Sequence, residues 1–587
     1  LVIRIDATGR QNIVVSYNLR DIDGSVDNVA QQFALQYRIG TTGDFTNVPA
    51  GYVADATSGP STATLVTAVR AVLPAAVNGQ SSVDIRIITT NAAANDEWVG
   101  IDDIVIQEAQ LPSSIYVNEV DSDTPGTDAA EFVELYAPSP IPTSTSLTDL
   151  VLVFFDGTTG TSTAAIDLDG RSTGLNGLFV VCDQPVNVTN CTLDLAGTAA
   201  TGFLTDGPGA VALYVGDAAS FPNGTAPTTE TVDAVVFGTS DPLATAFLEA
   251  LGESVQFEED YNGAGATEGL ARVNASVPGP GFTIPVVSDL FYALAPTPGA
   301  ANPASVTVDA TDEVADVAGW RLLGLPVTEG FSSSPPPNNL GIFGPPPFQV
   351  GDLAGINLVQ GVAAGKSNGP QYPTAPGVNI LTSYSGTGTT AGFAGPSSTD
   401  ESLPPGRGFF WYFYDQNINP ADDGPFGPGT SESYDLADPD FELSLTGFPI
   451  DDFVSSGTVV PTSDDGLYLA ANPYAYPFRL SGVGVKGADL STNFSVYNPE
   501  AAGGLGSYQT LTDADVIAPW QGVFAEATIQ EALQGGSIAI FTTSNAVVPT
   551  SDVTLIGRGA AEARLGFRLE GTLASGAGVA DHAATVR

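Results

Sequence analysis

Acidic side chains gather in the stretch NEVDSDTPGTDAAEFVELY, residues 118–136. A loop with Pro and Gly supplies three candidate Ca²⁺ ligands, Asp121, Asp123 and Asp128. Loops of this kind provide the hard oxygen ligands that Ca²⁺ needs. The two glutamates that follow, Glu131 and Glu134, could instead form the carboxylate pair of a hydrolase, which requires a cleft and a raised pKa.

The segment EFVELY alternates like a strand, so Glu131 and Glu134 point to opposite faces, each among apolar side chains. We therefore expect at least one of them to be partly buried and paired with a loop amide or an arginine. Nothing in the sequence indicates a cleft around them. We interpret these acids as structural, with a Ca²⁺ site on the loop aspartates as the alternative.

A second set of candidate Ca²⁺ ligands lies in the first 109 residues. The segments RDIDGSVDN (20–28) and NDEWVGIDDIVI (95–106) supply five aspartates, Asp21, Asp23, Asp27, Asp102 and Asp103. If this part of the chain binds Ca²⁺, we expect Asp102 or Asp103 to act together with the acids of the loop. The loop lacks the twelfth-position Glu of an EF-hand. The alternative is that these residues end strands and form Asx turns.

The only two cysteines lie nine positions apart, in CDQPVNVTNC. Their spacing across a polar turn predicts one disulfide, Cys182–Cys191, that closes a hairpin loop, and an oxidising compartment. Two free buried thiols are the alternative.

Catalytic motifs are scarce. His582 is the only histidine, which argues against a His-based triad or a His metal cluster within this chain. No G-x-S-x-G, P-loop or dinucleotide motif occurs in a fitting strand–helix context. We expect the chain not to be an enzyme, while a hydrolase that uses only carboxylates stays open.

The elements that position these residues read almost everywhere as short strands. Segments such as NIVVSYNL (12–19), QQFALQYRI (31–39) and DLVLVFFD (149–156) are rich in β-branched and aromatic residues and are bounded by Gly, Pro, Asn and Asp. DPLATAFLEAL (241–251) is the best short helix, with Asp241 as its expected cap and Gly252 just beyond its end. We predict an all-β chain of serial β-sandwich domains.

Linker-like segments divide the chain. QEAQLPSS (107–114), APTPGAANPAS (295–305) and VVPTSD (547–552) carry the turn residues that separate domains. We expect a partial jelly-roll-like sandwich at 1–109, a second sandwich at 112–303, a duplicated β module at 304–549 and the start of a further β domain at 550–587. The chain contains no Met, and we expect a processed or truncated product that lacks strands at its ends.

Two segments resemble known families. GIDDI, within residues 95–106, is similar to the closing strand of jelly-roll modules of the concanavalin, MAM and carbohydrate-binding type, many of which hold Ca²⁺. SIYVNEVDSDTPGTDAAEFVELYAPS (114–139), with VDAVVFGTSD (232–241) and the close FYALAPTPGAANP (291–303), resembles a lamin-tail domain. That resemblance implies an immunoglobulin-like sandwich without catalytic activity, a module that bacteria often append to secreted or surface enzymes, including extracellular nucleases.

An internal repeat is visible in the third unit, with copies at about 319–415 and 466–528. Each copy runs from a strand through a Pro break and a strand with Tyr to a Pro-x-x-Gly turn and an aromatic strand. We expect Trp320 to be equivalent to Tyr468, and Phe410 to Phe524. The repeat resembles a module of bacterial secreted proteins found ahead of C-terminal sorting domains.

Charge excludes some partners. The chain has 17 basic and 66 acidic residues, for a formal net charge of −49. Such a surface repels phosphate backbones and anionic membranes, so we expect no nucleic-acid binding. No run of 18 apolar residues is present, so we expect no membrane insertion.

These observations predict a secreted extracellular or cell-surface structural protein that forms a higher-order assembly or filament. Its expected partners are other copies of itself, other cell-surface components and glycans. We expect its terminal units to contact other copies, or other segments of the same precursor, more than the central units do, and any assembly to need salt or divalent cations. The alternative is a Ca²⁺-dependent carbohydrate-binding or accessory region of a larger secreted hydrolase.

Overall fold

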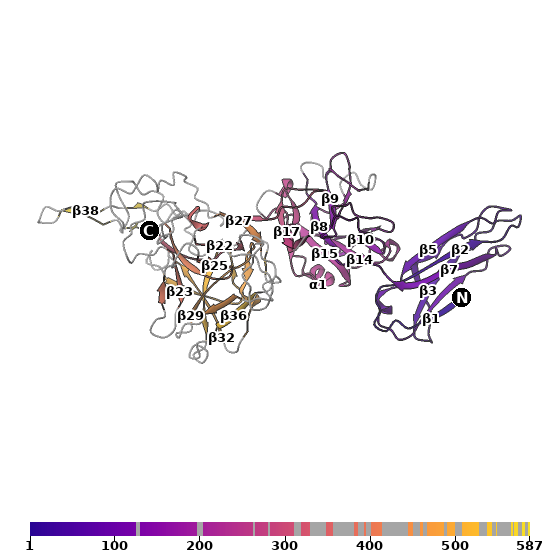
Figure 1. The fold of residues 1–587 in the computed structure, drawn as a ribbon, viewed down its shortest axis with the longest axis horizontal. Helices are drawn as coiled ribbons and strands as arrows, with labels where there is room; N and C mark the ends of the chain where they lie inside the picture. Colours follow the sequence, from indigo (N-terminus) through magenta and orange to yellow (C-terminus); the bar gives the residue numbers. More distant parts are fainter. Residues whose placement is uncertain are drawn as a thin grey trace. The chain divides into compact units, whose positions relative to one another are not determined.

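A computed structural model of the chain shows strands throughout (Figure 1). It divides the chain into two compact units, Leu1–Ala304 with Pro549–Ser551, and Ser305–Val548 with Asp552–Arg587. The structure describes residues 1–124, 129–195, 203–261, 265–279, 282–309, 319–328, 348–350, 352–355, 381–385, 392–394, 401–413, 444–449, 458–461, 467–486, 490–498, 507–527, 537–542, 547–548, 565–566, 569–572, 578–581 and 585–586.

Residues 1–109 form a β-sandwich, the first module of the first unit. Its strands are β1 (Val2–Ile5), β2 (Ile13–Asp21), β3 (Phe33–Ile39), β4 (Thr46–Val53), β5 (Val66–Val72), β6 (Val83–Thr89) and β7 (Val99–Glu108). One sheet has the order β1-β6-β3-β4, and the other has the order β5-β2-β7. A single 3-10 turn, η1 (Ala75–Val77), precedes β6.

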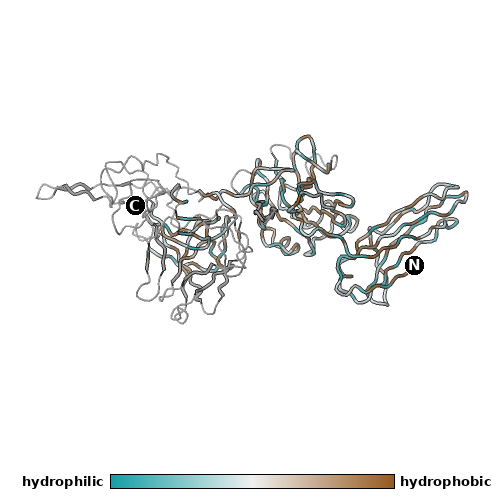
Figure 2. Tube along the Cα trace, in the orientation of Figure 1, coloured by the Kyte–Doolittle hydropathy of each residue, from teal (hydrophilic) through white to brown (hydrophobic). Residues whose placement is uncertain are grey.

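Alternation along the strands builds the core of this sandwich. In β2 the side chains of Val15, Tyr17 and Leu19 are buried, and in β6 those of Val83, Ile85 and Ile87 are buried. Polar residues take the positions between them, as period two requires. Hydrophobic and hydrophilic residues therefore follow one another along the strands of this module (Figure 2).

The second module of the first unit is a larger sandwich. Its strands are β8 (Tyr116–Asp121), β9 (Phe132–Tyr136), β10 (Leu150–Asp156), β11 (Thr161–Asp167), β12 (Leu178–Cys182), β13 (Leu193–Asp194), β14 (Gly209–Val215), β15 (Thr231–Gly238), β16 (Gln256–Glu258), β17 (Gly269–Gly279) and β18 (Phe282–Leu294). The sheets have the orders β11-β10-β14-β15-β16 and β13-β12-β9-β8-β17-β18. Two 3-10 turns, η2 (Ala218–Ser220) and η3 (Gly265–Thr267), lie between strands.

One short helix, α1 (Thr245–Leu251), covers the five-stranded sheet. It buries Phe247, Leu248 and Leu251 against a cluster that includes Val153 and Val236. Strand β10 is therefore buried on both faces, which explains its nearly continuous apolar sequence.

The expected cap of this helix is wrong. The helix begins after Ala244, not at Asp241, and Ala244 makes no side-chain cap hydrogen bond. The Asp241 carboxylate instead accepts a hydrogen bond from the Thr239 nitrogen, within the preceding turn. Gly252 ends the helix with a φ of 78°, as its position predicted.

Polar contacts join the modules of the first unit. The Arg70 guanidinium forms a bidentate pair with Asp149, with Nε–Oδ1 at 2.8 Å and Nη2–Oδ2 at 2.6 Å. The Val72 nitrogen donates to Oδ2 of Asp217 at 2.9 Å. Burial raises the pKa of the Asp217 carboxyl to about 7.

The second unit contains the remaining described strands. They are β19 (Val306–Asp309), β20 (Gly319–Leu323), β21 (Val327–Thr328), β22 (Phe348–Gln349), β23 (Leu381–Ser385), β24 (Gly392–Ala394), β25 (Ser402–Leu403), β26 (Phe409–Phe413), β27 (Ser444–Pro449), β28 (Thr458–Pro461), β29 (Leu467–Ala471), β30 (Phe478–Arg479), β31 (Val483–Lys486), β32 (Leu490–Asn498), β33 (Ser507–Leu511), β34 (Val516–Ile517), β35 (Gly522–Ala527), β36 (Ser537–Thr542), β37 (Leu565–Gly566), β38 (Leu569–Thr572), β39 (Gly578–Asp581) and β40 (Thr585–Val586). Its 3-10 turns include η4 (Asp352–Gly355) and η7 (Leu480–Gly482).

Two four-stranded sheets in this unit have the same topology. Their orders are β20-β26-β23-β24 and β29-β35-β32-β33, so in each the first strand pairs with the last and the last with the second. Leu322 lies opposite Phe410 in one sheet, and Leu469 lies opposite Phe524 in the other. The four side chains pack together in one core cluster.

The strand register corrects one expected equivalence. If Phe410 matches Phe524, then Leu322 matches Leu469 and Trp320 matches Leu467, not Tyr468. The expected pair was one residue out of register.

The predicted fold class is confirmed: the chain is all-β and is built from serial β-sandwich domains. In the part of the chain that the structure describes, no helix has the length and apolar character needed to cross a bilayer.

Candidate functional site

Two buried glutamates face each other on the adjacent strands β8 and β9. Glu119 and Glu134 are cross-strand partners, and neither side chain is exposed. Glu119 Oε1 accepts a hydrogen bond from the Thr297 nitrogen at 2.6 Å, and Oε2 accepts one from Thr297 Oγ1 at 3.2 Å. Glu134 accepts from Asn118 Nδ2 and from the Gly299 nitrogen, both at 2.7 Å. The pair therefore holds residues 297–299 against the sheet through hydrogen bonds.

The protonation of this pair is set by its burial. Burial raises the pKa of Glu119 to about 7, and hydrogen bonds from Thr297 oppose the shift. Burial raises the pKa of Glu134 to about 8, and the charge of Glu119 adds to the shift. The pair therefore keeps its protons to a higher pH than free glutamates do.

Glu131, which the sequence offered with Glu134 as a candidate catalytic pair, also holds loop backbone. It is fully buried, and its Oε2 accepts hydrogen bonds from the nitrogens of Phe203 at 2.5 Å and Leu204 at 3.0 Å. Both Glu131 and Glu134 thus bind loop amides, as the alternating pattern predicted for at least one of them.

A fourth buried acid, Glu259, holds the loop that follows β8. Its two carboxylate oxygens accept from the nitrogens of Ser122 at 2.8 Å and Asp123 at 3.0 Å. Burial raises the pKa of Glu259 well above its usual range. Asp121 is itself buried beside this contact. Of the three expected Ca²⁺ ligands in this loop, Asp128 lies outside the described residues.

A buried arginine, Arg272, pairs with a different acid of this module, Asp233. The Arg272 guanidinium donates to the carbonyl oxygens of Val117, Ser288 and Asp289, and to both oxygens of Asp233 at 3.1 and 3.2 Å. Asp233 also accepts from the Val117 nitrogen at 2.7 Å. The pair ties β8, β15, β17 and β18 together.

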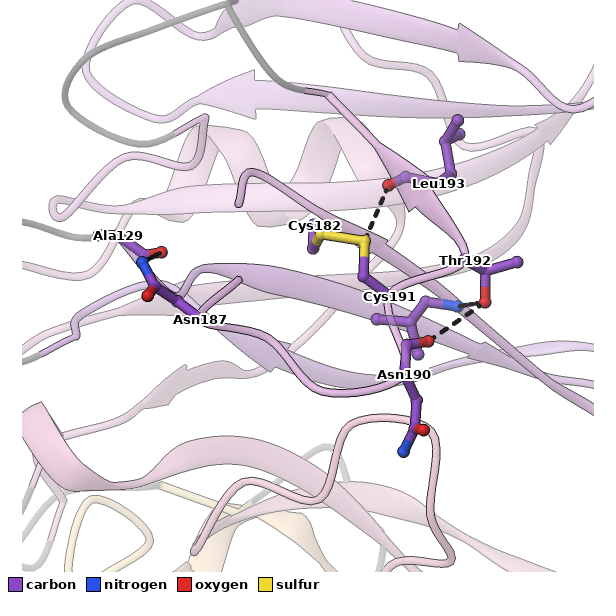
Figure 3. Close-up of a disulfide and its surroundings, with 8 residues drawn as sticks. Ala129, Cys182, Asn187, Asn190, Cys191, Thr192 and Leu193 are labelled. Carbon is purple, nitrogen blue, oxygen red and sulfur yellow. Dashed lines mark hydrogen bonds between the residues drawn. A yellow bond between two sulfur atoms is a disulfide. The ribbon is translucent and has the colours of Figure 1, made fainter. Parts of the chain in front are cut away.

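The cysteines form a disulfide, with the sulfur atoms 2.03 Å apart (Figure 3). The loop between them makes two further anchors. Asn187 Nδ2 donates to the Ala129 oxygen at 2.8 Å, and Asn190 Nδ2 donates to the Pro298 oxygen at 3.0 Å. The second bond reaches the same segment that Glu119 and Glu134 hold, so the disulfide loop and the buried acids fix one region of the module.

The five candidate aspartates of the first module bind protein groups. In the 20–28 loop, Asp21 accepts from the Asp23 nitrogen, Asp23 accepts from the Ser25 nitrogen, and Asp27 accepts from Asn95 Nδ2. The first two contacts are Asx turns.

Asp102 and Asp103 bind a different group from these loop acids. Both instead bind the Arg20 guanidinium, Asp102 at 2.7 Å and Asp103 at 3.1 Å. Among the described residues, no group of three or more His, Cys, Asp or Glu side chains is arranged so that it could hold a metal ion. The Ca²⁺ site stays a prediction.

Sequence reasoning missed Glu119, Glu259 and Arg272. Glu119 carries a usable signal, because it lies inside a strand that also contains Val117 and Val120, where an acid must find a partner. The partners of Glu259 and Arg272 come from strands and loops far away in the chain, so no local pattern marks them. Chemically, the arrangement accepts hydrogen bonds from loop amides, which stabilises loops.

No protein-family model matches this chain, and no curated protein does so either.

Proposed function

We propose that the chain is a non-catalytic structural protein of the cell surface or extracellular space that assembles with other copies of itself. One observation carries the proposal: the acids that could have done chemistry, Glu119, Glu131, Glu134 and Glu259, are buried and hold loop backbone. A hydrolase would need such carboxylates beside a substrate cleft.

Three further points support this proposal. A disulfide is typical of proteins in oxidising compartments, which include the cell surface and the extracellular space. Serial β-sandwiches with loops held by buried hydrogen bonds suit a protein that must keep its shape. The resemblance to lamin-tail domains points the same way, since that module is non-catalytic.

Microscopy of the intact protein tests the proposal. Purified chain at an ionic strength of about 0.15 M, where long-range repulsion is screened, should form oligomers or filaments. Antibodies raised against it should label the surface of intact cells. Labelling only after the cells are broken, together with a chain that stays single at every concentration, would refute the proposal.

A second candidate function is Ca²⁺-dependent carbohydrate binding, as an accessory region of a larger secreted hydrolase. It is favoured by an exposed aromatic ring near the loop acids of the first module. Trp98 is 71% exposed, and its carbonyl oxygen accepts from the nitrogen of exposed Ile22, beside Asp21 and Asp23. A glycan array probed with and without a chelator tests this function, which requires binding that the chelator abolishes.

A further inference from the structure

A cluster of arginines lies on the outer face of the β1-β6-β3-β4 sheet. At its centre, Asp84 binds two guanidinium groups, Arg4 Nε at 2.7 Å and Arg38 Nη2 at 2.7 Å. The Asp84 side chain is 1% exposed, whereas that of Arg4 is 57% exposed. Hydrogen bonds from Arg4 and Arg38 lower the pKa of Asp84 to about 2. Two guanidinium groups thus share one carboxylate, and net positive charge remains at the surface.

Arg86, next to this trio on β6, is held by neutral groups. Its Nε and Nη2 donate to Gln36 Oε1 at 2.7 and 2.5 Å. Its guanidinium lies 3.9 Å from the centre of the Phe45 ring, which Arg38 contacts at 4.4 Å. No carboxylate in the described part of the chain forms an ion pair with Arg86. Stacking and hydrogen bonds therefore orient a cation that lacks a counter-charge.

Apolar side chains border these cations. Val2 is the cross-strand partner of Arg86, Ile88 lies two residues further along β6 on the same face, and both are exposed. We name this surface the arginine face; it comprises Val2, Arg4, Arg38, Arg86 and Ile88. A preorganised patch of cations with an apolar border is the kind of surface that binds a protein segment bearing carboxylates.

The other sheet of the same module carries a surface of opposite charge. Asp102 and Asp103 share the single Arg20 guanidinium, and their side chains are 52% and 61% exposed. They lie on β7, the strand at the end of the β5-β2-β7 sheet. The strand bulges here, and Asp103 has a φ of 52°. Ile104 and Val105, which follow, are exposed. We name Asp102–Val105 the acidic edge.

We propose that the arginine face of one copy binds the acidic edge of a second copy. The two surfaces are complementary in charge and share an apolar component. The inference rests on the proposed function and names the contact through which the copies assemble. Because the two surfaces belong to different sheets of the sandwich, the contact is heterologous, and such contacts propagate into open chains unless the rotation closes a ring.

Net charge sets the conditions for this contact. Copies that each carry a charge of −49 repel one another at low ionic strength, where the Debye length is about 30 Å at 0.01 M. At about 1 M salt the Debye length falls to about 3 Å, and the local ion pairs weaken as well. We therefore expect association to be strongest at intermediate ionic strength, near 0.15 M.

Sedimentation velocity on the intact chain tests the proposal, with the double variant Arg4→Gln/Arg86→Gln. The control is Arg10→Gln, which also removes a cation from this module but at an exposed pair with Glu108. At about 0.15 M salt, wild type and control should associate, and the double variant should associate at least about tenfold more weakly. Circular dichroism should show that all three are folded.

Charge exchange identifies the partner surface. Arg86→Glu chains and Asp102→Arg chains should each associate weakly alone, and mixing them should restore association. Equal association by wild type and double variant would overturn the contact, while leaving the proposed structural role intact. A wild-type chain that stays single at every ionic strength would overturn both. Binding of single wild-type chains to polygalacturonate through the same arginines, without self-association, would show a glycan site and overturn the proposal.

Discussion

Gly324 and Ala471 meet at the centre of the second unit, where a Cβ atom on Gly324 would collide with the Cβ atom of Ala471. The backbone at these two residues makes two equivalent hydrogen bonds. The Gly324 nitrogen donates to the Trp520 oxygen at 2.9 Å, and the Ala471 nitrogen donates to the Gly406 oxygen at 3.0 Å. When Phe410 is matched with Phe524, each of these bonds is the counterpart of the other.

Isolated bridges follow the same rule. Leu323 pairs with Gln521, and Ala470 pairs with Arg407. Gly406 has a φ of 78°, and its counterpart Trp520 has a φ of 68°. In each half of the unit, the end of one strand therefore bonds to a turn of the other half. The two sets of contacts are related by an approximate two-fold axis near Gly324 and Ala471.

The contact between Gly324 and Ala471 predicts how exchanging the two residues changes the free energy of unfolding. Gly324→Ala should lower the free energy of unfolding by about 2 kcal/mol, because the added methyl group overpacks the contact. Ala471→Gly should cost about 1 kcal/mol through backbone entropy alone. The double variant should recover most of the loss from Gly324→Ala. Urea unfolding followed by tryptophan fluorescence measures all three, since three of the four tryptophans (Trp320, Trp411 and Trp520) lie in this unit.

If Gly324→Ala and Ala471→Gly simply add their costs in the double variant, the two residues do not share the contact. The reciprocal arrangement at this position would then be wrong.

The buried Glu119–Glu134 pair predicts that the protein loses stability as pH rises. The pKa of Glu134 is about 8 in the folded chain against an ordinary value of 4.5. Between these values the folded state holds more protons than the unfolded state, so the free energy of unfolding falls with pH. Each unit of pKa difference is worth about 1.4 kcal/mol. Thermal unfolding at pH 5 and pH 9 should show the lower Tm at pH 9.

Glu134→Gln should reduce this difference in Tm, because an amide does not ionise yet can still accept from the Gly299 nitrogen. Glu108→Gln, at an exposed pair with Arg10, is the matched control and should leave the difference unchanged. A Glu134→Gln protein with the full wild-type difference would show that this carboxyl does not carry the effect.

The disulfide predicts a response to reductant. Opening a loop of about ten residues should lower the free energy of unfolding by about 2 to 3 kcal/mol. Dithiothreitol should therefore lower the Tm of wild type. The Cys182→Ala/Cys191→Ala chain should start at the lower Tm and ignore the reductant. A reductant effect on that variant would assign the loss to something other than the disulfide.

Arg70 and Asp149 predict a strong coupling between the first and second modules. The Asp149 side chain is 1% exposed, so Arg70→Gln leaves a buried carboxylate without its main partner. The expected loss of stability is about 3 kcal/mol. Asp149→Asn in addition should recover part of it, because an amide is less costly to bury than an unpaired charge. A double-mutant cycle measures the coupling, and a coupling near zero would contradict this account.

The sequence predicted the strands well because alternation and turn residues are local signals. Strand β2 is an example, with every second side chain from Val15 to Leu19 buried between polar neighbours. The helix end at Gly252 was equally local. The beginning of the helix was not, because the Asp241 carboxylate accepts from the Thr239 nitrogen in the turn before the helix.

The candidate site was harder to predict, because its partners are distant in the chain. Glu134 binds Gly299, and Glu131 binds Leu204, across separations that no spacing rule covers. The pattern could show that a buried acid needs a partner, but only the fold supplies that partner. The Trp320–Tyr468 equivalence failed for a related reason: the register of each strand with its neighbour depends on pairing that the sequence does not show.

We propose that this chain is a structural protein whose copies assemble. Sedimentation of the intact wild-type chain across ionic strength shows whether they do. We predict species larger than one chain near 0.15 M salt, and single chains at about 0.01 M and about 1 M. A single chain at all three ionic strengths, at the highest concentration the protein reaches, would contradict the account.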